Sequence, residues 1–374
     1  MSVYLDYNAT APIRPRAKAA ATAALDIGAN PSSTHAAGRK ARAEVERARA
    51  EVAQLAGAAP SAVTFVSGGV EANALAMESA RADGRERIIV GATEHDSVWA
   101  GAHAHWAAVE VWPVDVRGVA DLDWLEEALA RGGRPLVCLM AANNETGVVQ
   151  PVAAAARMAR EAGSWLHVDA VQAAGKAPLD FAALGAHTLA LSAHKLGGPQ
   201  GVGALIVGET TAISRRMHGG GQERGRRPGT ENLSGIAGFG AAAAAALADL
   251  PNGEIQTAWR DELAERMARA GAIVLGKGAP RLAQTLCVAT PGFSSEVQVM
   301  ALDLAGVMVS AGAACSSGKV KASRVVEAMG RPDLAACSIR VSGGWESSEA
   351  DWRRCGEAWA EAFERHAARR KEYA

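Results

Sequence analysis

The sequence lacks the cysteine patterns of zinc knuckles and disulfide frameworks. It has five cysteines, an odd number, and no two of them form a CxxC pair: Cys138, Cys287, Cys315, Cys337 and Cys355. Such a set fits neither a structural metal site nor a complete set of disulfides, so we expect a protein of the reducing cytoplasm with no metal.

An excess of one charge and a long apolar run are lacking too. Lys and Arg number 39 against 40 Asp and Glu, and the formal net charge is −1, which gives no electrostatic basis for binding nucleic acid or anionic lipid. No apolar run approaches the roughly 18 residues that a membrane helix needs. The opening MSVYLDYNATAPIRP has no basic stretch followed by an apolar core, so we expect no secretory signal. Nucleic acid and membrane are therefore not expected as partners.

Short β-branched runs alternate with helical patterns through the first part of the chain. Seven runs predict strands, at residues 63–66, 87–90, 109–112, 136–141, 165–170, 188–193 and 203–207. Helical patterns lie between them, near 38–57, 70–83, 95–107, 121–131 and 152–162. This alternation predicts an α/β fold with a mostly parallel seven-stranded sheet flanked by helices. In such a sheet, ligands bind beyond the carboxyl ends of the strands.

A turn with the sequence PNGE follows the helix predicted at 232–249 and marks the expected domain boundary. We predict a large domain over 15–250 and a smaller α+β domain formed by 1–14 and 251–374. The C-terminal stretch has large residues at helical spacing, which predicts a buried helix face rather than a cofactor site: Trp352, Cys355, Trp359 and Phe363.

Lys195 follows a predicted strand in the segment LSAHKLGGPQGVGAL. It could be an ordinary surface lysine, or a Schiff-base lysine whose amine is desolvated enough to be neutral. Upstream, Asp169 ends the apolar run WLHVDA, where it could cap a helix or keep a protonated pyridine nitrogen charged. Because one helix and one strand separate the two residues, both can reach one pocket, which favours a site for pyridoxal 5′-phosphate (PLP).

A phosphate site and a reactive thiol would complete this site. In SGGVEANALAM, at 67–77, a strand end, a Gly pair and a helix start follow one another, and the N–H groups of a helix start favour an anion. Cys315 lies in the small-residue run SAGAACSSGKV, whereas Cys138 and Cys287 lie among bulky apolar residues. Cys315 is therefore the best candidate for a reactive thiolate. The alternative is a small residue chosen for a tight turn.

Ten segments, in order along nearly the whole chain, resemble the cysteine desulfurases, a group of class V aminotransferase-like, fold-type I PLP enzymes. They are YLDYNATAP, ANPSSTHAAGRKAR, SGGVEANALAM, ATEHDSV, AANNETGVVQP, HVDAVQAAGK, SAHKLGGPQGVGAL, GGGQERGRRPGTEN, AGAACSSG and IRVSGG. The loop at about 310–322 resembles the subgroup associated with iron–sulfur cluster or nitrogenase sulfur supply. The resemblance implies that L-cysteine is converted to alanine, with its sulfur passed to an acceptor protein such as an iron–sulfur scaffold.

The resemblance also implies catalytic roles. Lys195 would form the Schiff base with PLP, and Asp169 would pair with the pyridinium nitrogen. His95 would stack on the ring and help to move protons, while Gln172 would hydrogen-bond the ring hydroxyl. Cys315 would carry the sulfur as a persulfide.

Further residues would bind the cofactor phosphate and the substrate. Thr230 would reach the phosphate of a neighbouring subunit, which implies a homodimer. Asn144 would contact the cofactor and, with Arg340, the substrate carboxylate, which the planar guanidinium can meet bidentately. Within one subunit the phosphate would be held by Gly69, Val70, Ser192 and His194.

The chain departs from the family pattern at Val70 and Gln200. Val70 stands where relatives usually have a threonine, so one phosphate hydrogen bond, worth roughly 1.5–3 kcal/mol, should be missing. Gln200 stands where lysine is frequent. Three other interpretations stay open: a selenocysteine lyase or cysteine sulfinate desulfinase, a non-catalytic sulfur-carrier or assembly subunit with the same fold, and RNA binding by the arginine cluster at 224–227.

Overall fold

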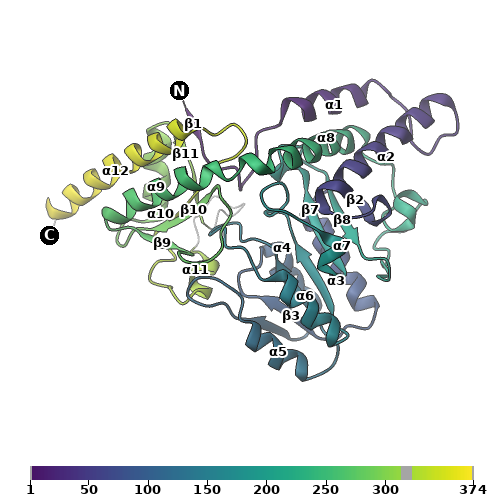
Figure 1. Ribbon diagram of the computed structural model, residues 1–374, viewed down its shortest axis with the longest axis horizontal. Helices are drawn as coiled ribbons and strands as arrows, with labels where there is room; N and C mark the ends of the chain where they lie inside the picture. Colours follow the sequence, from purple (N-terminus) through teal and green to yellow (C-terminus); the bar gives the residue numbers. More distant parts are fainter. Residues whose placement is uncertain (1, 313–321, 373–374) are drawn as a thin grey trace.

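The computed structural model describes residues 2–312 and 322–372 (Figure 1), and its largest sheet has seven strands. The strand order is β2-β8-β7-β6-β5-β3-β4. All neighbours from β7 to β4 are parallel, whereas β8 is antiparallel to both of its neighbours. The strands are β2 (Val63–Val66), β3 (Ile88–Gly91), β4 (Val109–Trp112), β5 (Leu136–Met140), β6 (Trp165–Asp169), β7 (Thr188–Ser192) and β8 (Gly203–Val207).

These strands confirm the predicted α/β fold and lie within one residue of the predicted bounds. Six of the seven are buried at every position, because helices cover both faces of the sheet, and this explains their continuous apolar sequences. The five predicted helices also form, within two residues of their predicted ends. They are α2 (Ala36–Ala56), α3 (Gly69–Ala82), α4 (Asp96–His105), α5 (Leu122–Ala130) and α6 (Val152–Glu161).

Alternate residues of the strands pack against different helices. Ile88 and Val90 of β3 pack in one cluster with Met77 of α3 and Val98 of α4. Ile89, between them, belongs to the cluster on the opposite face. That second face is covered by α2, α5, α6 and α8 (Leu233–Asp249), and α1 (Pro15–Leu25) packs on α8. The period of two along each strand thus separates two hydrophobic layers.

A second, four-stranded sheet is built from the C-terminal third of the chain. It is antiparallel, with the order β12-β13-β10-β9. The first residues of the chain join this part, because β1 (Val3–Tyr4) pairs in parallel with β11 (Val307–Met308). The remaining elements are β9 (Ile273–Leu275), β10 (Thr285–Ala289), β12 (Ser310–Ala311), β13 (Ser338–Ser342), α7 (Phe181–Leu184), α9 (Ile255–Arg269), α10 (Ser295–Leu304), α11 (Arg324–Ala328) and α12 (Glu349–Glu372).

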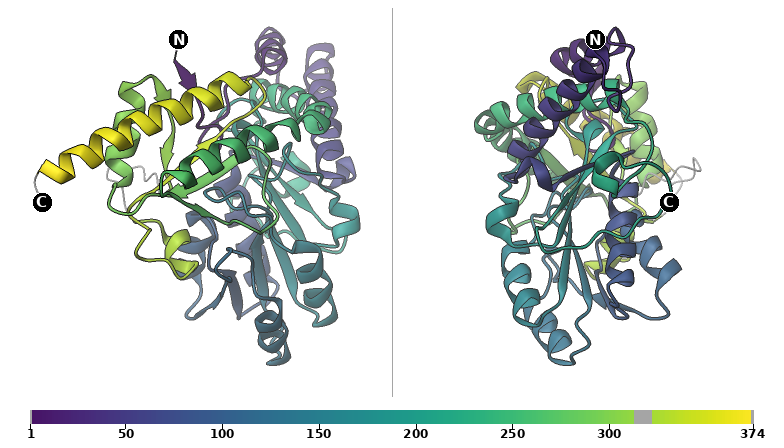
Figure 2. Two further views of the ribbon diagram at one scale, coloured as in Figure 1. Left: turned by 60° about the vertical axis from the view of Figure 1, so that its left-hand side comes forward. Right: turned by 90° about the vertical axis from the view of Figure 1, so that its right-hand side faces the viewer.

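The long helix α12 runs along the outside of this second part, with the C-terminus at its far end (Figure 2). Its predicted apolar stripe is confirmed as core, because Trp352, Cys355 and Trp359 are fully buried and Phe363 packs against them. The predicted domain boundary near residue 250 lies between α8 and α9 and stays a prediction.

Within residues 2–312 and 322–372, no helix combines the length and apolarity needed to cross a bilayer. The same residues contain no cluster of three or more His, Cys, Asp or Glu side chains that could hold a metal ion.

Candidate active site

Ten of the predicted site residues line one cavity of about 380 Å³. Most of them follow β2, β3, β5, β6 and β7, whose carboxyl ends meet at one edge of the large sheet, and the last comes from β13 of the small sheet. They are Gly69, Val70, His95, Asn144, Asp169, Gln172, Ser192, His194, Lys195 and Arg340. Two predicted residues are not among them. Thr230 is exposed and does not line this cavity, and Cys315 lies outside the described residues.

Lys195 is half-buried at the end of a short 3-10 turn, Ala193–Lys195, directly after β7. Its Nζ donates hydrogen bonds to the carbonyl oxygens of Asn8, at 2.7 Å, and Ala9, at 2.8 Å. Burial, and next the charge of Arg340, lower the pKa of Lys195 to about 8. Roughly a tenth of such an amine is neutral at pH 7, far more than for an ordinary lysine. Lys195 is therefore not an ordinary, exposed surface lysine, which was the alternative that its sequence position left open.

Asp169 is the last residue of β6 and is 6% exposed. Its Oδ2 accepts a hydrogen bond from Asn73 Nδ2 at 2.8 Å, and its Oδ1 accepts one from the Val171 backbone N–H at 3.0 Å. The chain continues in turns rather than a helix, so Asp169 is not a helix cap. The described residues give this carboxylate neutral donors and no ion pair, so a pyridinium N–H would supply the cation that a buried carboxylate needs.

Asn73 connects Asp169 to the residues around His95. Besides Asp169, its Nδ2 donates to Ser97 Oγ at 2.8 Å, and this oxygen lies 2.8 Å from His95 Nδ1. The Ser97 backbone N–H also donates to His95 Nδ1 at 3.1 Å, so that nitrogen is an acceptor and the ring N–H is on Nε2. His95, which is expected to stack on the cofactor ring, and Asp169, which is expected to pair with the pyridine nitrogen, therefore belong to one hydrogen-bond network.

His167 fixes the other side of the Asn73 amide. Its Nε2 lies 2.9 Å from Asn73 Oδ1, and its Nδ1 lies 2.9 Å from Thr188 Oγ1. Burial lowers the pKa of His167 to about 4, so the ring is neutral. Because an amide oxygen only accepts, His167 Nε2 is the donor, and Nδ1 accepts from the threonine hydroxyl. Neither Asn73 nor His167 was predicted from the sequence. A signal existed for Asn73, which is four residues after Gly69 and so shares its face of α3.

The start of α3 gives the cavity donors that an anion needs. Gly69 begins α3, and a Cβ added there would lie 2.9 Å from Val171 Cγ2, so any larger residue would require the Val171 side chain to shift. Ser192 lies beside Gly69, since its Cβ would be 3.7 Å from the added Cβ, and His194 lines the same cavity. Burial, and next the charge of Lys195, lower the pKa of His194 to about 4, so it acts as a neutral hydrogen-bonding group. A helix N-terminus with these side chains suits a phosphate.

Arg340 on β13 is 4% exposed and is anchored on two sides. Its Nη2 forms an ion pair with Asp6 Oδ1 at 2.7 Å, and its Nη1 donates to the Asn144 backbone oxygen at 3.2 Å. These bonds use two of the five N–H groups of the guanidinium, so others remain for a carboxylate ligand.

Asn8 is a third residue that was not predicted from the sequence, although it lies in the YLDYNATAP segment. Its backbone oxygen accepts from Lys195 Nζ and from Gln172 Nε2, the latter at 2.9 Å. Its side-chain Nδ2 donates to the Asn144 backbone oxygen at 3.1 Å and to Thr285 Oγ1 at 3.0 Å. Asn8 therefore forms hydrogen bonds with Lys195, with Gln172 and with the backbone of Asn144.

The arginine cluster at 224–227 makes contacts within the protein. Arg227 pairs with Glu71 at 3.0 Å, and Arg226 and Arg224 donate to groups of residues 61–64. The neighbouring Glu223 forms a buried pair with Arg49, with both Nη–Oε distances at 2.8 Å. These bonds favour a structural role for the cluster over RNA binding.

The lining residues fit PLP. One cavity combines an anion-binding end, a buried carboxylate without a cation, and a lysine amine of lowered pKa. A phosphate, a pyridine nitrogen and an aldehyde are the three groups that such a donor set would hold.

Comparisons with known proteins give the family. The sequence profile of the Aminotransferase class-V family matches residues 3–352. Among similar curated proteins, the cysteine desulfurase of Frankia sp. (strain EuIK1) is 41% identical over 96% of this chain and 91% of its own length. The cysteine desulfurase of Cereibacter sphaeroides is 42% identical over 89% of this chain and 88% of its own. The solved structure of a NifS-like protein from Rickettsia africae is 32% identical, with a TM-score of 0.90 over 97% of this chain and all of that one. The chain therefore belongs to the class-V aminotransferase family and, within it, to the PLP-dependent cysteine desulfurases.

Proposed function

We propose that this protein removes sulfur from L-cysteine, with PLP held by Lys195 and the sulfur accepted by Cys315. The observation that supports this most directly is the single cavity in which Lys195, Asp169 and the start of α3 converge. The curated relatives with about 40% identity bear the name cysteine desulfurase.

When bound, PLP supplies an electron sink for the carbon next to the substrate nitrogen. The residues of this chain then bind, orient and move protons. Arg340 and Asn144 hold the substrate carboxylate, which directs the Cα–H bond toward Lys195. With a pKa of about 8, Lys195 has a neutral fraction that can take this proton at neutral pH. His95 offers its Nε2 to the same cavity for a second proton transfer.

The sulfur step is a transfer between two thiols. The Cys315 thiolate attacks the substrate sulfur, a new S–S bond forms, and the Cβ–S bond breaks. The electron pair of the broken bond stays with the substrate carbon, which takes a proton and leaves as alanine. One thiol and one cysteine thus become one persulfide and one alanine, and no external oxidant is needed.

The test is to add L-cysteine to the purified enzyme and measure alanine and protein-bound persulfide. We expect Cys315→Ala to keep the visible absorbance of bound PLP but to form no persulfide. Cys337→Ala is the matched control, because Cys337 is buried and burial raises the pKa of its thiol, which should make it inert. Full sulfur transfer by the Cys315 variant would refute the role of that residue.

The proposal includes a homodimer, a protein acceptor and a reducing cytoplasm. Thr230 supports the first, because it is exposed and is free to approach a neighbouring subunit. The cytoplasm is supported by Cys138, Cys287, Cys337 and Cys355, which are all free thiols. Sedimentation velocity should give the mass of a dimer, and Thr230→Val should weaken PLP binding without changing that mass. An unchanged PLP affinity would remove Thr230 from the phosphate site.

A further inference from the structure

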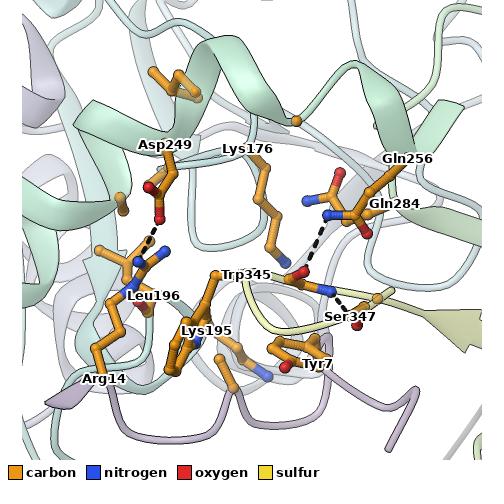
Figure 3. Close-up of a pocket in the computed structure, with 18 of the residues that line it drawn as sticks. Tyr7, Arg14, Lys176, Lys195, Leu196, Asp249, Gln256, Gln284, Trp345 and Ser347 are labelled. Atoms are coloured by element: carbon orange, nitrogen blue, oxygen red, sulfur yellow. Dashed lines mark hydrogen bonds and ion pairs between the residues drawn. The ribbon is translucent and has the colours of Figure 1, made fainter. Parts of the chain in front are cut away.

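A second cavity (Figure 3) has a volume of about 240 Å³ and shares Lys195 with the cofactor cavity. Its wall also contains Tyr7, Arg14, Gln256, Gln284 and a second lysine, Lys176. Lys176 does not line the cofactor cavity. Any effect of Lys176 on PLP must therefore pass through another residue.

Lys176 bonds directly to two residues of the cofactor cavity wall. Its Nζ lies 2.7 Å from Gln172 Oε1 and 2.8 Å from Asn8 Oδ1. Burial lowers the pKa of Lys176 well below its usual range, and the charges of Lys195 and Arg340 act in the same direction. The N–H groups of this amine are matched by these two acceptors.

These contacts determine which way the Gln172 amide points. Its oxygen accepts from Lys176, and its Nε2 donates to the Asn8 backbone oxygen at 2.9 Å. In the flipped orientation the amide oxygen would face the Asn8 carbonyl oxygen, which is another acceptor. The observed orientation leaves the second N–H of Nε2 for the cofactor cavity, which Gln172 lines.

We propose that Lys176 is a positioning residue that fixes the Gln172 amide so that it presents N–H, and not oxygen, to the ring oxygen of PLP. A donor at this place favours the ionised ring oxygen over the hydroxyl, because hydrogen bonding to the charged form stabilises it. A lysine outside the cofactor cavity thereby sets a protonation state inside it. This inference rests on the proposed contact between Gln172 and the cofactor.

The variants separate this role from a structural one. Lys176→Met keeps the length of the side chain and removes both donors. Lys176→Arg restores donors, and the adjoining cavity offers room for the larger head group. Lys277→Met is the matched control, because Lys277 is exposed and far along the chain. Should Lys176→Met fail to fold, Lys176→Gln, which keeps one donor group, takes its place.

Two quantities are measured, the dissociation constant of PLP from the apoenzyme and the pH midpoint of the visible band of the bound cofactor. We expect Lys176→Met to weaken PLP binding about ten-fold, as for the loss of one hydrogen bond to a charged group, and to move the midpoint. Lys176→Arg should return both toward wild type, and Lys277→Met should change neither.

A double-mutant cycle with Gln172→Ala decides how Lys176 acts. If it acts through Gln172, Lys176→Met changes nothing further in the Gln172→Ala protein. Equal effects of Lys176→Met in both backgrounds, or no effect in either, would overturn the inference. If Gln172→Ala alone changed neither quantity, the proposed contact of Gln172 itself would fail, which is a distinguishable result.

Discussion

A substitution at Val70 should raise the affinity of the protein for PLP, by an amount that follows from one added hydrogen bond. It is the second residue of α3, lines the anion-binding end of the cofactor cavity, and is 64% exposed. Threonine has nearly the same shape as valine, and both are β-branched, so Val70→Thr adds a hydroxyl without a change in packing. Because the position is exposed, little buried apolar surface is lost.

The added hydroxyl would donate one hydrogen bond to a phosphate. Such a bond to a charged group contributes about 1.5–3 kcal/mol. Since 1.4 kcal/mol is a factor of ten, PLP should bind Val70→Thr roughly 10- to 150-fold more tightly than wild type. The free energy of unfolding of the apoenzyme should stay within about 0.5 kcal/mol, as for other surface substitutions.

The assay is titration of the apoenzyme with PLP, followed by the visible absorbance. Val116→Thr is the matched control, since Val116 is 76% exposed and does not line the cofactor cavity. It should leave the affinity unchanged. If Val70→Thr bound PLP no more tightly than Val116→Thr, the start of α3 would not be the phosphate site.

Three further predictions concern groups with altered pKa or buried hydrogen bonds. Because the pKa of Lys195 is lowered to about 8, capture of PLP by the apoenzyme should speed up about ten-fold per pH unit below 8 and level off above it; a flat stopped-flow profile would contradict this. Asn73→Ala should lower the free energy of unfolding in urea by about 1–3 kcal/mol, because buried His167 loses its acceptor, whereas a change near zero would show that the pair is replaceable. Burial, and next the charge of Asp169, raise the pKa of Glu94 from 4.5 to about 8. As the pH rises, the unfolded chain therefore loses this proton at a lower pH than the folded protein does. Stability contributed by this group should therefore fall as pH rises from about 4.5 to 8, and Glu94→Gln should remove the fall; parallel urea curves for the two proteins would refute this.

The strands of the large sheet could be predicted from the sequence to within one residue. They are continuous apolar runs, and the segments between them have apolar residues at helical spacing. The same regularity placed Asp169 and Lys195 at the ends of neighbouring strands, since β6 and β7 are parallel and their carboxyl ends share an edge. The order of the motifs then predicted eight further residues of the cavity, including Arg340 from the second sheet.

The residues that orient this set could not be found in the same way. Asn8 and Lys176 are joined by a hydrogen bond although they lie 168 residues apart in the sequence, and no local sequence pattern indicates such a contact. His167 lies on an apolar strand, where a buried histidine resembles any other core residue until Asn73 is seen 2.9 Å from its ring. Sequence patterns predict which groups reach the cofactor edge, but not which neutral partners fix their orientation.

Two lysines near one cavity give the most direct test of where the cofactor is attached. The PLP-bound enzyme is reduced with borohydride, which makes the bond to lysine permanent, and its peptides are mapped by mass spectrometry. We predict that the pyridoxyl group is on Lys195, whose amine lines the cofactor cavity, and is absent from Lys176. Modification of Lys176, or of any lysine other than Lys195, would contradict the assignment of the active site.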